Sequence, residues 1–150
     1  MKAFLISLTL VSLSVTATAQ SSEDSVKMVI NKMFAGMKNA DSAMFMSTFA
    51  PDAILQTIGM NKQRQTVVAT DKLSEFAGFV AKLKKDSADE RITFDMIKID
   101  GALAIAWTPY KFYHNGNFSH CGVNSFQLVK YNGEWKIQYL VDTRRRTNCL

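Results

Sequence analysis

The stretch RITFDMIKIDGALAIAWTPYKFYHNGNFSHCGVNSFQLVKYNGEWKIQYLVDT, residues 91–143, decides the fold. It is interrupted by three turn pairs, Asp100-Gly101, Asn115-Gly116 and Asn132-Gly133, and such pairs are preferred in tight β-hairpins. The runs between them are rich in β-branched and aromatic residues, which is typical of strands. The sequence therefore predicts four antiparallel strands in meander order, over residues 91–100, 102–113, 118–131 and 134–143.

The residues upstream of this meander show helical spacing instead. From Ser22 to Lys38 the apolar residues recur at i, i+3, i+4 and i+7, which predicts an amphipathic helix. The sequence further predicts a short helix capped by Asp41, a weak pair of strands over residues 53–58 and 65–70, and a third helix from Asp71 to about Lys85. Helices followed by a run of strands predict an α+β domain, with three N-terminal helices packed on one face of a curved, mainly antiparallel sheet.

Hairpin pairing across the three turns predicts which side chains share a face of the sheet. A large, apolar set is expected to face the helices: Phe94, Met96, Leu103, Ile105, Trp107, Asn124, Phe126, Leu128, Ile137, Tyr139 and Val141. The opposite face is smaller and more mixed, and it includes Ala102, Ala104, Ala106, Val123, Ser125 and Leu140. Because this outer face is flat and small-residued, we expect it to contribute to a homodimer, with ordinary solvation as the alternative.

Length, charge and missing motifs limit the class of protein. A chain of 150 residues, 47% hydrophobic and 21% charged, predicts one globular domain. A formal charge of +5 permits nucleic-acid binding, but the basic residues are scattered apart from the run at residues 144–146, so no nucleic-acid partner is expected. The sequence contains no G-x-S-x-G, no phosphate-binding glycine-rich loop and no metal-ligand spacing, so neither a cofactor nor a metal is predicted.

The first nineteen residues have the pattern of a targeting signal. Lys2 is followed by a short apolar run and by Ala17-Thr18-Ala19 before Gln20, which is typical of a cleaved secretory signal. We therefore expect residues 20–150 to form the mature domain, exported to the periplasm or secreted, without stable membrane insertion. An oxidising compartment would allow Cys121 and Cys149 to form a disulfide that fixes the C-terminal tail to a strand.

Asn124 is the polar residue in the middle of the predicted inner face. A buried amide needs a hydrogen-bond partner, supplied either by the protein or by a ligand. A curved sheet closed by helices commonly leaves an apolar pocket with few polar groups, the form that small-molecule sites take. The predicted ligand contacts are Trp107, Tyr110, His120, Asn124, Phe126 and Tyr139.

Two residues are candidates for catalysis. His120 is the one histidine on a predicted strand, and its near-neutral titration suits a general acid or base. Asp142 lies at the end of the last predicted strand, where it is either a second candidate base or the ion-pair partner of Arg144. No partner carboxylate for His120 is evident in the sequence.

Four segments carry a resemblance to a known superfamily. They are Phe49–Ala53, Trp107–Phe112, Ser119–Asn124, and Gly133–Ile137 running into Asp142–Arg145. With the order of helices before meander, the chain resembles the nuclear transport factor 2-like superfamily, specifically the exported group labelled putative lumazine-binding. The resemblance implies a cone-shaped, cystatin-like α+β fold, commonly dimeric, with a pocket between the sheet and the helices. The superfamily includes ketosteroid isomerases and polyketide cyclases, whose acidic catalytic residues have no position-by-position match in this sequence.

Three functional hypotheses follow. The first is an exported protein that binds a small aromatic or apolar molecule in the pocket. The second is a cofactor-free isomerase or cyclase that uses His120 or Asp142 as its base. The third is a non-catalytic structural or interaction dimer, which a pocket filled by side chains would favour.

Overall fold

The computed structural model describes residues 22–149, so the predicted signal segment lies outside the described residues. The helices in this range are α1 (Ser22–Lys38), α2 (Ser42–Met46) and α3 (Leu73–Val80). The strands are β1 (Phe49–Met60), β2 (Thr66–Asp71), β3 (Ala88–Ile92), β4 (Met96–Asp100), β5 (Leu103–His114), β6 (Asn117–Tyr131) and β7 (Glu134–Thr143). No helix within residues 22–149 is long and apolar enough to cross a membrane.

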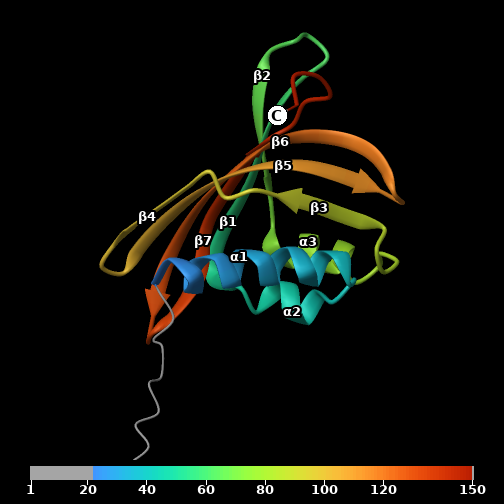
Figure 1. Cartoon of the computed structure of the whole chain (residues 1–150). Helices are drawn as coiled ribbons and strands as arrows, with labels where there is room; N and C mark the ends of the chain where they lie inside the picture. Colours follow the sequence, from blue (N-terminus) through green and yellow to red (C-terminus); the bar gives the residue numbers. More distant parts are fainter. Residues whose placement is uncertain (1–21, 150) are drawn as a thin grey trace, which may run out of the picture.

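The strands form one curved, mixed sheet, and the helices cover one of its faces (Figure 1). Its strand order is β2-β1-β7-β6-β5-β3, and β4 also pairs with β5. The pairing of β1 with β7 is parallel, and every other pairing is antiparallel. The predicted α+β class, with three helices on a curved and mainly antiparallel sheet, is confirmed.

The three helices differ in how well the sequence predicted their ends. Helix α1 has the predicted bounds, and the Asp41 side chain caps α2 by accepting a hydrogen bond from the Met44 amide at 2.8 Å. The predicted cap of α3 is wrong, because Asp71 is the last residue of β2, paired with Leu55 of β1. This helix begins at Leu73 after an uncapped Lys72 and ends at Val80, before the predicted end.

Two strand predictions are also corrected. The predicted strand over residues 91–100 is divided into β3 and β4, which both pair with β5, while the Thr93 amide between them still donates to the Pro109 carbonyl at 3.0 Å. Strand β1 begins at Phe49 and passes through Pro51, so Pro51 lies within a strand rather than before one. The long β1 is possible because it lies between β2 and β7 and pairs with both.

Two β-bulges shift the register that the hairpin turns predict. In β6, His120 pairs with Phe112 but Phe118 pairs with Tyr113, so Ser119 is an extra residue. In β7, Ile137 pairs with Leu128 but Tyr139 pairs with Gln127, so Gln138 is an extra residue. A one-residue shift moves every later side chain to the opposite face of the sheet. Pro109, although it has no backbone N–H, pairs regularly with Val123.

The shifted register reverses the predicted faces of β5 and of the end of β7. Phe126, Leu128 and Ile137 are fully buried in the core, as predicted. On β5, however, Ala104, Ala106 and Thr108 are the buried residues, whereas Leu103 and Trp107 are 48% and 42% exposed. The predicted inward residues that are wrong are Leu103, Ile105, Trp107, Tyr139, Val141 and Met96.

Small residues on the inner face of β5 match the large side chains of α1. Ala104 and Ala106 belong to the same buried cluster as Val26, Ile30 and Met33. Alanines in the sheet leave volume that these larger helix residues fill, which keeps the interior densely packed. The predicted small-residued dimer face is therefore wrong in its composition, because three of its members, Ala104, Ala106 and Leu140, face the helices.

Tyr110 and Gly122 make a close contact beyond this core. Tyr110 is 4% exposed and pairs with Gly122, and its hydroxyl donates to the Thr143 carbonyl at 2.9 Å. A Cβ added at residue 122 would overlap that same carbonyl oxygen and would lie 2.8 Å from a Tyr110 ring carbon. Glycine is required here because Tyr110 and the β7 backbone occupy the space that a side chain would need.

We expect Gly122→Ala to lower the free energy of unfolding by about 1–3 kcal/mol or more, because the added methyl group overpacks a site bounded by backbone. Gly78→Ala is the matched control, because a Cβ at that position of α3 has no atom within 4 Å and alanine favours helix. Urea unfolding of both variants measures the difference. Equal free energies of unfolding for the two variants would contradict this prediction, because they would show that Tyr110 and the Thr143 backbone move aside with no loss of stability.

Candidate functional site

A pocket lies between the three helices and the inner face of the sheet. Its space, part of it open to solvent, is about 490 Å³. The helices supply apolar side chains to its wall: Met33, Phe34 and Met37 from α1, Phe45 from α2 and Phe76 from α3. The sheet adds Leu55 and Leu140 together with a polar group of residues. The lining residues of this hollow thus come from all three helices and from the sheet.

Glu90 and Asn124 form one polar unit of the pocket. Asn124 is 4% exposed, and its side-chain N–H donates to Glu90 Oε1 at 2.8 Å. Burial, together with the nearby negative charge of Asp142, raises the pKa of the Glu90 carboxyl to about 7, although the Asn124 hydrogen bond opposes the shift. The buried amide is therefore satisfied by the protein, through a carboxyl group that changes its charge near neutral pH.

Asp142 is the centre of a second polar unit. Its carboxylate accepts hydrogen bonds from the Thr57 hydroxyl, from Arg144 Nε at 2.8 Å and from the Tyr110 hydroxyl at 3.2 Å. Arg144 also donates to Thr57 Oγ1 at 3.0 Å. Burial, with the negative charges of Asp142 and Glu90, raises the pKa of the Tyr110 hydroxyl, which therefore stays protonated and donates. The Asp142 carboxylate is thus fixed in place by three donors, one of which is an arginine.

His120 lies outside the lining of this pocket. Its Nδ1 is 3.0 Å from Ser119 Oγ, and its ring packs against Phe112 and Tyr110, with ring centroids 4.9 and 5.7 Å away. Burial lowers the pKa of His120, and the positive charge of Arg144 lowers it further. The imidazole is accordingly neutral near pH 7, packed among aromatic rings at the far end of β5 and β6.

The predicted ligand contacts therefore separate into three groups. Asn124 lines the pocket, as does the candidate base Asp142. Tyr110 does not line the pocket, but its hydroxyl donates to Asp142. Phe126 is fully buried in the core behind it, against Phe34 at a ring-centroid distance of 6.2 Å. Trp107 and Tyr139 are on the outer face, because the two bulges shift their strands by one residue; Trp107 pairs with Met96 and Ser125, and Tyr139 pairs with Gln127.

Sequence reasoning missed Glu90. The predicted strand began at Arg91, one residue too late to include it. The signal was the alternation of Ala88, Glu90 and Ile92, in which a carboxyl group takes the inward position between two apolar residues. Reading β3 from Ala88 would have placed Glu90 on the same face as Asn124.

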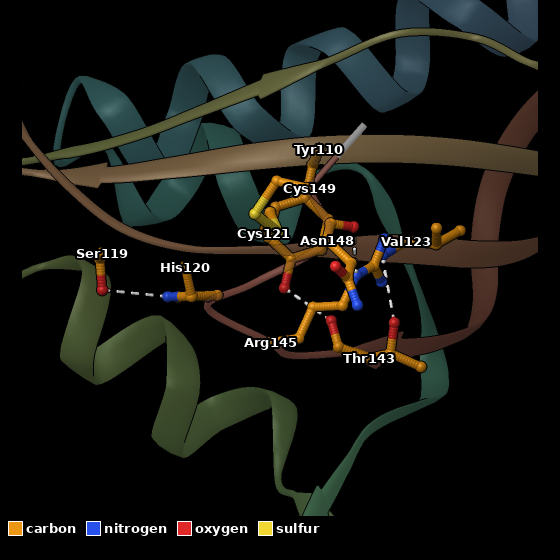
Figure 2. The surroundings of a disulfide bond; sticks show 9 residues. All are labelled: Tyr110, Ser119, His120, Cys121, Val123, Thr143, Arg145, Asn148 and Cys149. Atoms are coloured by element: carbon orange, nitrogen blue, oxygen red, sulfur yellow. Dashed lines mark hydrogen bonds between the residues drawn. A yellow bond between two sulfur atoms is a disulfide. The ribbon is translucent and has the colours of Figure 1, made fainter.

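The disulfide between Cys121 and Cys149 is present, with a Cα–Cα distance of 5.8 Å (Figure 2). Cys121 exchanges two backbone hydrogen bonds of 2.8 Å with Arg145, rather than lying opposite the predicted Arg144, because the β7 bulge displaces the tail by one residue. The neighbouring Thr143 hydroxyl accepts from the Val123 amide at 3.2 Å. The residues on both sides of Arg144 are thus bonded to β6, Thr143 through its hydroxyl and Arg145 through its backbone, which positions the guanidinium beside Asp142.

Comparison with known proteins places the chain in a family. The model of a family described as "Putative lumazine-binding" matches residues 21–139. The chain belongs to this family. No curated protein matches the sequence significantly.

Solved structures show the same fold at low sequence identity. A nuclear transport factor 2-like protein of unknown function from Shewanella baltica is 15% identical, with a TM-score of 0.64 over 83% of this chain and 94% of that chain. A domain of unknown function with a cystatin-like fold from Nostoc punctiforme is 16% identical, with a TM-score of 0.65 over 87% of this chain and 82% of that chain. The predicted cone-shaped nuclear transport factor 2-like fold is confirmed.

Within the part of the chain that the structure describes, no group of three or more His, Cys, Asp or Glu residues is arranged to hold a metal ion. The side chains of the pocket offer apolar contact, hydrogen bonding by Asn124 and Thr57, and a carboxyl group at Glu90 that changes its charge near neutral pH.

We expect the free energy of unfolding to fall as pH rises from about 4.5 to about 7, because Glu90 binds its proton more tightly in the folded than in the unfolded chain. Glu90→Gln keeps an acceptor for Asn124 and lacks this ionisation. The stability of the variant relative to the unmodified protein should therefore rise by up to about 3 kcal/mol between pH 4.5 and pH 8. Urea unfolding at the two pH values measures this.

Glu75→Gln is the control for this prediction, because Glu75 is a 68% exposed side chain on α3. Its stability difference from the unmodified protein should be nearly the same at both pH values. Glu90→Gln behaving like Glu75→Gln would contradict the raised pKa of Glu90.

Proposed function

We propose that this chain is an exported protein that binds a small, partly apolar molecule in the pocket between the helices and the sheet. The observation that carries the proposal is the pocket itself: a hollow that opens to solvent, with an apolar wall and a small set of polar groups. Ligand sites in proteins have this composition, with apolar surface for affinity and a few polar atoms for orientation. Membership of a family described as lumazine-binding supports the same reading.

The isomerase or cyclase alternative has one observation in its favour. Glu90 is a pocket carboxyl group whose pKa of about 7 suits proton transfer at neutral pH. Of the two bases expected from the sequence, Asp142 is held by three donors and His120 does not line the pocket. An enzyme using this pocket would therefore employ Glu90 as its base.

Mass spectrometry under native conditions tests the proposed function. The full chain is expressed in a host that exports it and is purified without refolding. We expect a bound small molecule that is released on denaturation. If residues 1–19 are removed on export, the protein should have the mass of a chain that begins at Gln20. A protein that never carries or takes up a small molecule would support the third hypothesis, a structural or interaction dimer.

Two variants of α1 locate the bound molecule. Met37 lines the pocket and is 7% exposed, whereas Met28 on the same helix is 54% exposed. We expect Met37→Trp to fill the pocket and to reduce the bound fraction at least tenfold, while Met28→Trp leaves it unchanged. Circular dichroism checks that both variants fold, and Leu140→Phe fills the same pocket from the sheet side if Met37→Trp does not. Full occupancy of both filled variants would place the ligand elsewhere.

We also propose that two copies of the chain form a homodimer through the outer face of the sheet. The residues on this face differ from those that the sequence predicted. This face presents Ile54, Met96 and Trp107, which are 46%, 39% and 42% exposed. Met96 and Trp107 pair with each other, whereas Ile54 is on β1, beyond β6 and β7. Exposed large apolar side chains on a sheet surface are typical of an interaction site. The bulges that turn Ala104 inward thus leave an outer face more apolar than the sequence predicted.

We expect Trp107→Glu to weaken the dimer at least tenfold, because it places a charge in the middle of this apolar face. Phe79→Glu on α3 is the matched control, because Phe79 is an aromatic residue 54% exposed on a different surface. Sedimentation velocity at micromolar concentration measures both. A monomeric unmodified protein, or equal dissociation of the two variants, would contradict the proposed interface.

A further inference from the structure

The charges that line the pocket are unequal. Three carboxyl groups, Asp71, Glu90 and Asp142, accompany one guanidinium, Arg144. Arg144 forms an ion pair with Asp142 through Nε and Oδ2 at 2.8 Å, so its charge is largely balanced by that residue. The excess charge of the pocket above neutral pH is therefore negative.

Glu90 has little to compensate its charge once it ionises. Its carboxyl group accepts one hydrogen bond from the protein, from Asn124 to Oε1, and no hydrogen bond to Oε2 is formed among residues 22–149. A buried carboxylate normally requires a cation or several donors. Glu90 Oε2 can therefore accept from, and its charge can be balanced by, a cationic group that enters the pocket.

The wall opposite these carboxyl groups is suited to the same charge. Phe34, Phe45 and Phe76 line the pocket, and the rings of Phe45 and Phe76 are stacked with centroids 5.3 Å apart. Aromatic faces attract cations, most strongly where the cation has lost its water. Met33 and Met37 add polarizable thioethers that adapt to different ligand shapes.

We propose that the pocket binds an organic cation, with an ammonium or amidinium group at Glu90 and an apolar body among the phenylalanine and methionine side chains. This inference rests on the proposed function and names its ligand class. An anion would have to take Arg144 from Asp142 and would lie near two further carboxyl groups. A neutral ligand could donate a hydrogen bond to Glu90 but would leave the charge of its ionised form unbalanced.

The affinity for such a cation depends on the ionisation of Glu90. The charged and titratable groups that face it are Asp142 from β7, Arg144 just after that strand, Tyr110 from β5, and Asp71 at the end of β2. The helices contribute only methionine and phenylalanine to the lining. Glu90, with a pKa of about 7, is therefore the group that converts a change of pH between 5.5 and 8.5 into a change in affinity.

Titration calorimetry with three probes of similar size tests the proposal: benzyltrimethylammonium, whose charge does not depend on pH, the neutral benzyl alcohol, and benzoate. We expect the cation to bind at least tenfold more tightly than either other probe at pH 8.5. Its affinity should fall up to about 30-fold on going to pH 5.5, the change in the ionised fraction of a group with a pKa of about 7. Benzyl alcohol should bind equally at both pH values.

Glu90→Gln should lower the affinity for benzyltrimethylammonium at pH 8.5 at least tenfold and should remove its pH dependence, while Glu75→Gln, on the exposed side of α3, leaves both unchanged. Should Glu90→Gln fail to fold, the pH profile of the unmodified protein decides alone. Stronger binding of benzyl alcohol or benzoate, a flat pH profile, or no binding of the cation would overturn the proposal. The proposed function would stand in those cases if a small molecule copurifies with the protein, and would fail with the proposal if none does.

Discussion

Successive side chains of a strand alternate between the faces of its sheet, so the extra Ser119 in β6 decides what lies on each side of this molecule. It brings Thr108 of β5 opposite Asn124, and the second bulge, at Gln138, brings Asp142 into the same row. Through β1 the row continues to Thr57. If the two bulges were absent, the Thr108 hydroxyl, the Asn124 amide and the Asp142 carboxylate would not share one face.

The same row explains why a polar group is found within an apolar pocket. Asn124 is satisfied by Glu90, whose carboxyl group is raised in pKa by burial, whereas Asp142 is satisfied by Thr57, Tyr110 and Arg144. Two carboxyl groups of one pocket thus have different environments. Asp142 is paired with an arginine, whereas Glu90, with a pKa of about 7, lies near the balance between its charged and neutral forms. Such a difference is costly to keep in a core and is commonly found where a ligand binds or reacts.

The disulfide connects the end of the chain to this arrangement. It joins the tail to β6 next to Gly122, where the Tyr110 ring crosses the strand and reaches the β7 backbone. Thr143 and Arg145, on either side of Arg144, both bond to β6. Arg144 is therefore held at the edge of the pocket by contacts on both sides of it, and the ion pair with Asp142 follows from that placement.

The sequence by itself determined the kind of fold: the amphipathic α1, the Asp41 cap, the three glycine turns, the α+β order and the pairing of Cys121 with Cys149. These features depend on local spacing, on turn chemistry or on there being two cysteines in the chain. The tertiary structure decided the register beyond each bulge, the parallel pairing of β1 with β7 and the inward position of Glu90. A bulge leaves no local signal, because it depends on how a strand fits its neighbours and the helices that cover it. For that reason Trp107, a ligand contact expected from the sequence, is on the outer face, and the pocket includes Glu90, one residue before the predicted strand.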